Sequence, residues 1–407
     1  MTLRRAAIVS PLRTPVGKFL GSLSSVSAGE LGAVIIRALM ERTGVDPERI
    51  DDVVFSQGYG NAEAPAIGRW SAMAAGLPLH VPGYQVDRRC GSGLQSVVDA
   101  AMMVQTGAAD CVIAGGVESM SNAEHYTLQV RGGVRAGNMV LHDRLTRGRL
   151  MSQPQERFGV ITGMIETAEN LAKDYGISRE ACDAYAVRSH LNAARAWAEG
   201  LFDNELVPVP VQQKKGDALI FDHDEGYRAD ATVEGLAKLK PLEANRDGAV
   251  VTAGNASQQN DAAAACLVVA EDKLAELGLE PIAWFTGWAA AGCDPSRMGI
   301  GPVPAVERLF ARTGLGWDDI DVVELNEAFA PQVLAVLKGW GWSEDDSRLG
   351  LLNVNGSGIS LGHPIGATGG RILANLTREL VRRGGRYGLE TMCIGGGQGM
   401  AAIFERV

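Results

Sequence analysis

The sequence has little that would suit a membrane or a nucleic-acid partner. No apolar stretch reaches the length of a bilayer, and the opening MTLRRAAIVSPLRTP lacks the apolar core of a secretory signal. The 407-residue chain has 38 basic and 48 acidic residues, a net charge of −10, with no long run of either sign. We therefore expect a cytoplasmic protein that binds neither membranes nor nucleic acid. An anionic ligand would need a local basic cluster.

Cysteine is also scarce. The six cysteines lie far apart, without the CxxC spacing of metal or redox motifs, at Cys90, Cys111, Cys182, Cys266, Cys293 and Cys393. With 46% hydrophobic residues, a chain of this length can bury a core without disulfides. We expect reduced thiols, some of which are available for chemistry.

Several catalytic and cofactor motifs are missing. There is no GxxxxGK[ST] phosphate loop, no GxGxxG after the first strand and no HExxH. GISLG at 358–362 matches a serine nucleophile elbow, but the only histidine beyond Ser360 is His363, which is too close to be a downstream triad partner. The acidic run DHDE at 222–225 is more typical of a solvated turn than of a cation site. Neither a metal nor a tightly bound cofactor is predicted.

Two pairs of segments indicate an internal duplication. TGVDPERIDDVVF at 43–55 resembles TGLGWDDIDVVEL at 313–325, and ADCVIAGGVESM at 109–120 resembles ETMCIGGGQGM at 390–400. Each copy has the pattern of a strand, a helix, a strand, and then another helix and a buried strand. This alternation predicts two related α/β halves, with a mixed or parallel sheet covered by helices on both faces.

The segment between the two copies differs in composition. Residues 121–250 are richer in Arg, Asp and Gln, contain one clear helical stretch, SREACDAYAVRSHLNAARAWAEG, and otherwise have the pattern of loops. We expect residues 1–120 with 251–271 to form an N-terminal half and residues 272–407 a C-terminal half. The intervening segment would be an inserted loop domain that covers a site formed by both halves.

Cys90, in VDRRCGSGLQSV, precedes a stretch with helical periodicity. At a helix N-terminus, free amide groups and the helix dipole favour a thiolate and lower its pKa. Gly91 and Gly93 would let a substrate approach the backbone. A lone cysteine is nevertheless more often a buried packing residue, so the other motifs must decide how Cys90 is interpreted.

Three further clusters contain candidate reactive groups. His363 lies in the glycine-rich NVNGSGISLGHPIGATGGR, and is a candidate base, with a histidine satisfied in a tight turn as the alternative. Cys393 ends an apolar strand and precedes three glycines whose amides can form an oxyanion hole. Asn326 and Glu327 follow another apolar strand in VVELNEAFAPQ, where an ordinary helix cap is the alternative.

Together, CGSG, NEAF, GHPIGATG and CIGGGQG, in this order and at these separations, resemble the four motif blocks of the thiolase family. Thiolases are acyl-CoA acyltransferases that make or cleave 3-oxoacyl-CoA. The resemblance covers essentially the whole chain. It implies an α/β fold of two pseudo-symmetric halves in α-β-α-β-α layers with an inserted loop domain. It also implies CoA and acyl-CoA as substrates, no tightly bound cofactor, and a homodimer or homotetramer with contacts through the loop domain.

The resemblance also assigns roles. Cys90 resembles the nucleophile that takes the acyl group as a thioester, and His363 the base that activates it. Cys393 resembles the second cysteine, which moves protons at the α-carbon and at the leaving thiolate. One oxyanion hole would consist of His363 and a water held by Asn326, and the other of the amides of Cys90 and Gly395.

For CoA, Arg228 resembles an arginine near the adenine and phosphate end, and Ser257 a serine near the pantetheine arm. Further contacts with this arm or the acyl group are implied for Ala256, Met164, Met298 and Phe329. Ordinary surface or core packing is the alternative for all of these positions.

The sequence departs from the family pattern near the expected site. Gly163 precedes Met164 where short-chain members often carry a histidine, which leaves room for a larger or branched acyl chain. Gln258 and Gln259 stand where a glycine and an apolar residue are usual, and VDRRC replaces VNRLC. We expect intact acyl-transfer chemistry with an altered substrate preference.

Two other functions are less consistent with these motifs. A ketoacyl synthase shares the fold, but NEAF and the second cysteine argue against it. A catalytically silent acyl-CoA carrier or scaffold is disfavoured because all four reactive side chains are present.

Overall fold

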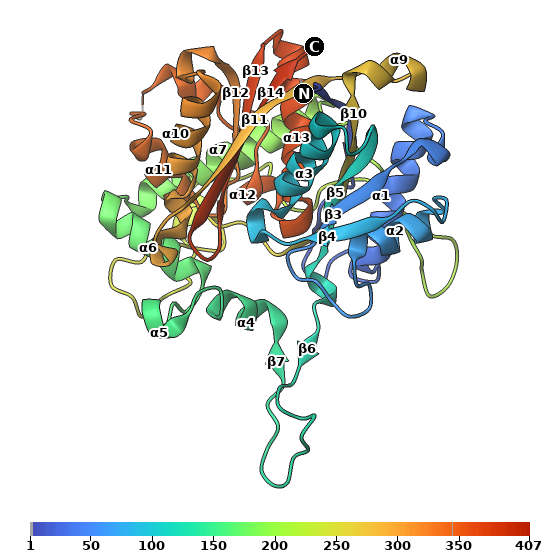
Figure 1. Cartoon of the computed structure of the whole chain (residues 1–407). Helices are drawn as coiled ribbons and strands as arrows, with labels where there is room; N and C mark the ends of the chain where they lie inside the picture. Colours follow the sequence, from blue (N-terminus) through green and yellow to red (C-terminus); the bar gives the residue numbers. More distant parts are fainter. Residues whose placement is uncertain (1–2, 344) are drawn as a thin grey trace.

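The computed structural model describes residues 3–343 and 345–407, and its largest feature is one mixed sheet (Figure 1). The strands of this sheet are β1 (Ala6–Arg13), β2 (Gly17–Lys18), β3 (Asp52–Ser56), β4 (Gly83–Val86), β5 (Cys111–Ser119), β10 (Asn260–Ala270), β11 (Ala283–Gly292), β12 (Ile320–Leu325), β13 (Tyr387–Ile394) and β14 (Gln398–Arg406). Their order is β12-β13-β14-β11-β1-β10-β5-β3-β4, with β2 paired to β10.

The strand pairing repeats on the two sides of the sheet centre. In the first half β1 pairs antiparallel with β10, β10 antiparallel with β5, and β5 parallel with β3. In the second half β11, β14, β13 and β12 repeat this pattern of two antiparallel pairs and one parallel pair. The halves meet where β1 pairs with β11. The predicted duplication and its pseudo-two-fold α/β fold are confirmed.

The helices divide into outer and central layers. The helices around the sheet are α1 (Ala28–Thr43), α2 (Ile67–Ala75), α3 (Ser92–Thr106), α9 (Leu274–Leu277), α10 (Pro302–Thr313), α11 (Ala330–Gly339), α12 (Gly358–Leu361) and α13 (Ile365–Arg383). Alternate strand residues face different layers: Val53 and Phe55 pack in the cluster with α1, whereas Val54 packs in the cluster with α3 and α13. That central cluster includes strands from both halves of the sheet. Helices α3 and α13 therefore lie between the layer formed by the first half of the sheet and the layer formed by the second half.

Glycine allows α3 and α13 to approach closely. A Cβ at Gly93 would lie 2.7 Å from the backbone N of Gly369, and a Cβ at Gly369 would overlap the backbone of Leu94. A Cβ at Gly91 would likewise lie 2.5 Å from Cδ1 of Ile394. The expectation that Gly91 and Gly93 admit a substrate is wrong, because these positions are filled by packing inside the protein.

The segment between β5 and β10 forms short strands and helices of different lengths. They are β6 (His125–Tyr126), β7 (His142–Asp143), α4 (Arg144–Leu150), α5 (Gln155–Phe158), α6 (Met164–Tyr175), α7 (Arg179–Ala198), β8 (Val209–Val211), β9 (Leu219–Phe221) and α8 (Val233–Ala237). In the view of Figure 1, α4 and α5 lie below the main body and α7 lies behind the sheet. The chain between β6 and β7 extends away from the body of the molecule, while α6 and α7 pack against α11. Among the described helices, none has both the length and the apolar character required to cross a bilayer.

Candidate active site

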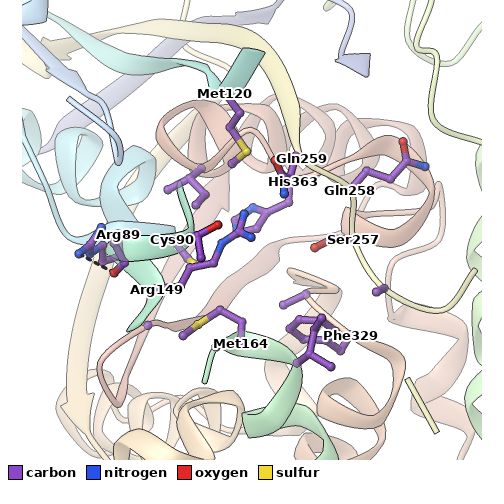
Figure 2. A pocket seen from close by; sticks show the side chains of 18 of the residues that line it. Arg89, Cys90, Met120, Arg149, Met164, Ser257, Gln258, Gln259, Phe329 and His363 are labelled. Carbon is purple, nitrogen blue, oxygen red and sulfur yellow. Dashed lines mark hydrogen bonds between the residues drawn. The ribbon is translucent and has the colours of Figure 1, made fainter. Parts of the chain in front are cut away.

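A cavity of about 630 Å³ lies where the inserted segment meets the two halves (Figure 2). Eight of the eleven residues predicted for the site line it: Cys90, Met164, Ala256, Ser257, Met298, Phe329, His363 and Gly395. Asn326 and Cys393 are fully buried behind its wall. Arg228 lies outside the lining. The residues from four separate motifs therefore converge on one place.

Cys90 lies in a short 3₁₀ turn that leads into α3. Arg89, directly before it, has φ +49°, a left-handed conformation that non-glycine residues rarely adopt. Two hydrogen bonds hold the turn: the Arg88 amide donates to Ser92 Oγ (2.7 Å) and the Arg89 amide to Asp87 Oδ1 (2.8 Å). The predicted position of Cys90 at a helix start is correct, and the turn places it in the cavity wall.

The pKa of Cys90 differs from the expectation. Burial raises the pKa of this thiol, while the backbone amide of Gly395, the charge of Arg89, its own amide and the charge of Arg149 act to lower it. Burial dominates because the side chain is only 9% exposed. The expectation of a lowered pKa is wrong, and Cys90 rests as a thiol that needs a base.

His363 lies between α12 and α13, held by neighbouring polar groups. Its amide donates to Asn260 Oδ1 (2.9 Å), and its Nδ1 lies 2.7 Å from Thr368 Oγ1. The Thr368 hydroxyl donates its own proton to the Pro364 carbonyl (3.0 Å), so it accepts from the ring. This arrangement assigns the proton to Nδ1 and leaves the Nε2 lone pair free. Nε2 has no hydrogen-bond partner among the described residues.

The protonation state of His363 follows from its surroundings. Burial lowers the pKa of the imidazole to about 3, and the charges of Arg371 and Arg149 act in the same direction. The ring is therefore neutral at physiological pH, and Figure 2 shows it next to Cys90. A neutral ring with a free Nε2 can take a proton from a thiol.

Asn326 follows β12, and its amide donates to the Thr391 carbonyl on β13 (3.0 Å). Its Nδ2 lies 3.5 Å from His363 Nδ1. Because both atoms carry protons in the tautomer assigned above, we treat this as a contact and not as a hydrogen bond. The buried Oδ1 of Asn326 has no protein partner within the described residues. The helix-cap alternative is excluded because α11 begins only at Ala330.

Glu327, the next residue, is a structural carboxylate. It accepts from Tyr185 Oη (2.9 Å), Ser189 Oγ (2.6 Å) and Asn353 Nδ2 (3.0 Å). Tyr185 and Ser189 belong to α7. The carboxylate therefore ties the NEAF loop to the inserted segment and fixes the position of Asn326.

Cys393 lies on β13 and is fully buried. Burial raises its pKa well above the ordinary range, and the neighbouring thiols Cys90 and Cys293 add to the rise. Cys393 is therefore a protonated thiol close to Cys90. Gly395 lines the cavity in the turn between β13 and β14, and the effect of its amide on Cys90 shows that this N–H faces the nucleophile.

The opposite wall is formed by the loop at 253–259 and the NEAF loop. Ala256 pairs with Phe329 in an isolated β-bridge, and the Ser257 amide donates to the Ala328 carbonyl (2.9 Å). From the inserted segment, Met164 begins α6, and its Sδ lies 3.5 Å from the position of a Cβ on Gly395. An extended apolar chain can lie between these walls.

Arg228 is exposed, and its guanidinium donates to the backbone carbonyls of Gly226 (3.3 Å) and Tyr227 (3.2 Å). Its assignment to CoA stays a prediction. Within residues 3–343 and 345–407, no three His, Cys, Asp or Glu side chains are grouped as a metal site.

Sequence reasoning missed several residues of the cavity wall. They include Lys18, Phe19, Tyr59, Met120, Arg149 and Ile365. Apart from Ile365, which lies in GHPIGATG, none belongs to one of the four motif blocks. Arg149 comes from α4, and only the docking of this helix beside the N-terminal half places it near Cys90. Its one signal in the sequence was the basic composition of the inserted segment.

Comparison with known proteins identifies relatives over nearly the whole chain. The family models for the thiolase N-terminal and C-terminal domains match residues 6–272 and 279–406. An acetyl-CoA acetyltransferase of Chromobacterium violaceum is 46% identical over 403 residues, which cover 98% of this chain and 99% of that protein.

Solved structures give the same result. The crystal structure of the Bacillus anthracis acetyl-CoA acetyltransferase matches with a TM-score of 0.93 and 39% identity, over 100% of both chains. Human mitochondrial 3-ketoacyl-CoA thiolase in complex with CoA matches with a TM-score of 0.91 and 37% identity, over 100% of this chain and 99% of that one. The predicted fold and family are confirmed: the chain belongs to the thiolase family.

Proposed function

We propose that this protein is an acyl-CoA C-acyltransferase that cleaves 3-oxoacyl-CoA with CoA into acyl-CoA and acetyl-CoA, and that catalyses the reverse condensation with the same residues. One observation carries the proposal: the thiol of Cys90, the neutral His363 with its free Nε2, and the Gly395 amide meet in one cavity, with the protonated Cys393 directly behind. A thiol, a base and a separate proton donor are what a two-step acyl transfer requires.

In the first half-reaction, Nε2 of His363 takes the Cys90 proton and the thiolate attacks the 3-oxo carbonyl. The bond between C2 and C3 breaks, which leaves the acyl group on Cys90 as a thioester. The electron pair goes to C2 of the departing acetyl-CoA, and the Cys393 thiol supplies its proton. The high pKa of Cys393 suits this step, because a carbanion needs a donor that is still protonated.

In the second half-reaction, the Cys393 thiolate takes the proton of incoming CoA. The CoA thiolate attacks the thioester, acyl-CoA leaves, and the Cys90 thiolate recovers its proton from His363. All groups return to their starting states. The reverse sequence gives the condensation, so metabolite concentrations set the direction.

Two oxyanions develop along this path. We assign one to the protonated Nε2 of His363 together with a water held by the buried Oδ1 of Asn326. The other falls to the amides of Cys90 and Gly395, which already act on the Cys90 sulfur. This assignment would give the glycine turn after Cys393 a catalytic role.

CoA and acyl-CoA are the expected ligands, without a tightly bound cofactor. We also propose a homodimer or homotetramer, and the exposed apolar residues of the extended segment between β6 and β7 support subunit contacts: Leu128, Val134, Met139, Val140 and Leu141. A cytoplasmic location stays a prediction.

The test is a thiolysis assay with acetoacetyl-CoA and longer 3-oxoacyl-CoA substrates, combined with trapping of a radiolabelled acyl group. We expect label on the Cys90 peptide, and we expect Cys90→Ser to lower kcat by roughly 10⁶-fold, the loss found when a catalytic nucleophile is removed. Label on Cys90→Ser equal to that on the parent protein would contradict the proposal. CoA binding without thiolysis would indicate a silent carrier, and decarboxylation of a malonyl thioester would indicate a ketoacyl synthase.

A further inference from the structure

The cavity has a positive charge that the acyl-transfer mechanism does not use. The lining includes three cationic side chains, Lys18, Arg89 and Arg149, but one carboxylate, Glu243, which is paired with Arg246 (3.4 Å). Across the described part of the chain, none of the ion pairs includes Lys18, Arg89 or Arg149. The whole chain has a net charge of −10, so the positive field in the cavity arises because these three cationic side chains are brought together there.

Arg149 is held without being neutralised. It lies on α4, whose N-terminus is capped by Asp143 through the amides of Leu145 (3.0 Å) and Thr146 (3.1 Å). Its guanidinium faces the phenol of the buried Tyr59. Burial raises the pKa of the Tyr59 phenol, and the charge of Arg149 partly offsets this rise. The phenol is therefore protonated at neutral pH. A neutral partner orients the guanidinium and leaves its charge free.

The position of Arg149 within the cavity indicates which part of a substrate it meets. Figure 2 shows its side chain directed toward Cys90 and His363, and its charge acts on both of these groups. The nucleotide phosphates of CoA are separated from the thioester sulfur by the whole pantetheine arm. A cation beside the nucleophile therefore lies in reach of the acyl portion and not of those phosphates.

Building on the function proposed above, we propose that Arg149 binds a carboxylate on the acyl chain, so that the preferred substrates are 3-oxoacyl-CoA thioesters with a second acidic group. The planar guanidinium matches a carboxylate with two parallel hydrogen bonds. Apolar side chains that line the same cavity, Met120, Met164 and Ile365, can pack against intervening methylene groups. A purely alkyl chain would displace water from the unpaired cation without replacing its hydrogen bonds.

A simpler role for Arg149 makes a different prediction. If its charge served only to stabilise the Cys90 thiolate, loss of that charge would slow the acylation of Cys90 equally for every substrate. A carboxylate site instead affects only substrates that carry the carboxylate. A pair of substrates that differ in this group alone separates the two roles.

The experiment compares thiolysis of 3-oxohexanoyl-CoA with that of 3-oxohexanedioyl-CoA, which has the same six-carbon chain and a terminal carboxylate. We expect the parent protein to prefer the diacid, and Arg149→Met to lower kcat/KM for the diacid by roughly 10- to 100-fold, the range for a lost charged hydrogen bond. The neutral substrate should change by less than about threefold, within the scatter of surface substitutions. Arg149→Lys should retain part of the preference, because it keeps the charge without the planar fork.

Arg147→Met is the matched control. Arg147 is on the same helix and its loss removes the same charge, but it lies away from the cavity, near the extended segment. It should leave the ratio of the two substrates unchanged. A parent protein that prefers the neutral substrate, or an Arg149→Met variant that slows both substrates equally, would overturn the proposal.

A binding measurement keeps this test separate from the proposed function. Hexanoyl-CoA and hexanedioyl-CoA have no 3-oxo group and cannot be thiolysed, and Cys90→Ser removes the thiol that would accept their acyl groups. In Cys90→Ser, hexanedioyl-CoA should bind more tightly, and adding Arg149→Met should remove the difference. This preference without thiolysis of any 3-oxoacyl-CoA by the parent protein would refute the acyltransferase and leave the Arg149 site standing. Thiolysis without the preference would refute the Arg149 site alone.

Discussion

The floor of the cavity and its cover differ in how firmly their side chains are held. The floor, meaning Cys90, His363 and Gly395 with Asn326 and Cys393 buried behind them, is built by the two halves at strand ends and helix starts. Its four side chains are at most 9% exposed. The cover, meaning Thr146, Arg149, Ser152 and Met164, comes from the inserted segment and is partly exposed. Short helices and loops hold it in place.

This difference separates chemistry from substrate choice. Floor groups are positioned by backbone pairing and buried hydrogen bonds, so changing one of them disturbs the reacting atoms for any substrate. Cover groups contact what is attached to the thioester and leave the reacting atoms in place. Variants of the two regions should therefore fall into two kinetic classes.

Among substitutions that keep the nucleophile, the largest effect should come from Asn326→Ala in the floor. Loss of the group that holds an oxyanion-hole water should lower kcat by roughly 10²- to 10³-fold, the range found when one such donor is removed. The loss should be the same for acetoacetyl-CoA and for a longer 3-oxoacyl-CoA. Steady-state kinetics on both substrates, with the thermal midpoint as a check on folding, measures it. A loss seen with only one of the two substrates would mean that Asn326 contributes to substrate choice, as the cover residues do.

The effect of Arg149, a cover residue, on the Cys90 thiol can be measured from the reactivity of that thiol. Because burial raises the pKa of Cys90 above its ordinary value of about 9, its thiolate fraction should rise roughly tenfold per pH unit from pH 7 to 9 without a plateau. The rate of iodoacetamide alkylation, read by mass spectrometry of the Cys90 peptide, reports this fraction. Arg149→Met should slow alkylation by less than about threefold, because the charge of Arg149 is the smallest of the effects that lower that pKa. A plateau below pH 8 would mean that amides and charges outweigh burial.

Cys393 is an internal control for this experiment. It is fully buried, and burial raises its pKa still further, so it should stay unlabelled over the same range. Labelling of both cysteines at similar rates would indicate opening of the β13–β14 region and would invalidate a pKa reading from Cys90.

Most of the floor could be predicted from the sequence because its residues lie in motifs. The duplicated pattern gave the paired α/β halves, since strand and helix periodicities are local properties. The resemblance of four motifs then brought together residues as distant as Cys90 and Cys393. The tautomer of His363 could not be predicted, because it depends on the Thr368 hydroxyl and on the carbonyl to which that hydroxyl donates.

The errors arose where tertiary packing outweighs a local effect. The helix start behind Cys90 favours a thiolate, but the surrounding core removes the solvent that a thiolate needs. The sequence predicts that Gly93 can contact a substrate, but a Cβ at this position would lie 2.7 Å from the backbone N of Gly369, so Gly93 serves helix packing. Arg149 carried no motif, because its function depends on where α4 docks and not on the residues beside it in the chain.

The smallest expected effect belongs to Met164 in the cover. Met164→Ala would open space beside Gly395, where Met164 Sδ now lies 3.5 Å from the position of a Cβ. The ratio of kcat/KM for 3-oxooctanoyl-CoA to that for acetoacetyl-CoA should rise by about 3- to 10-fold, at the low end of what methylene-sized changes in a pocket produce. Met151→Ala is the matched control, because Met151 is 50% exposed and does not line the cavity. If Met164→Ala instead slowed both substrates equally, Met164 would be holding the Gly395 turn in place, and the boundary between floor and cover would have to be redrawn to include it.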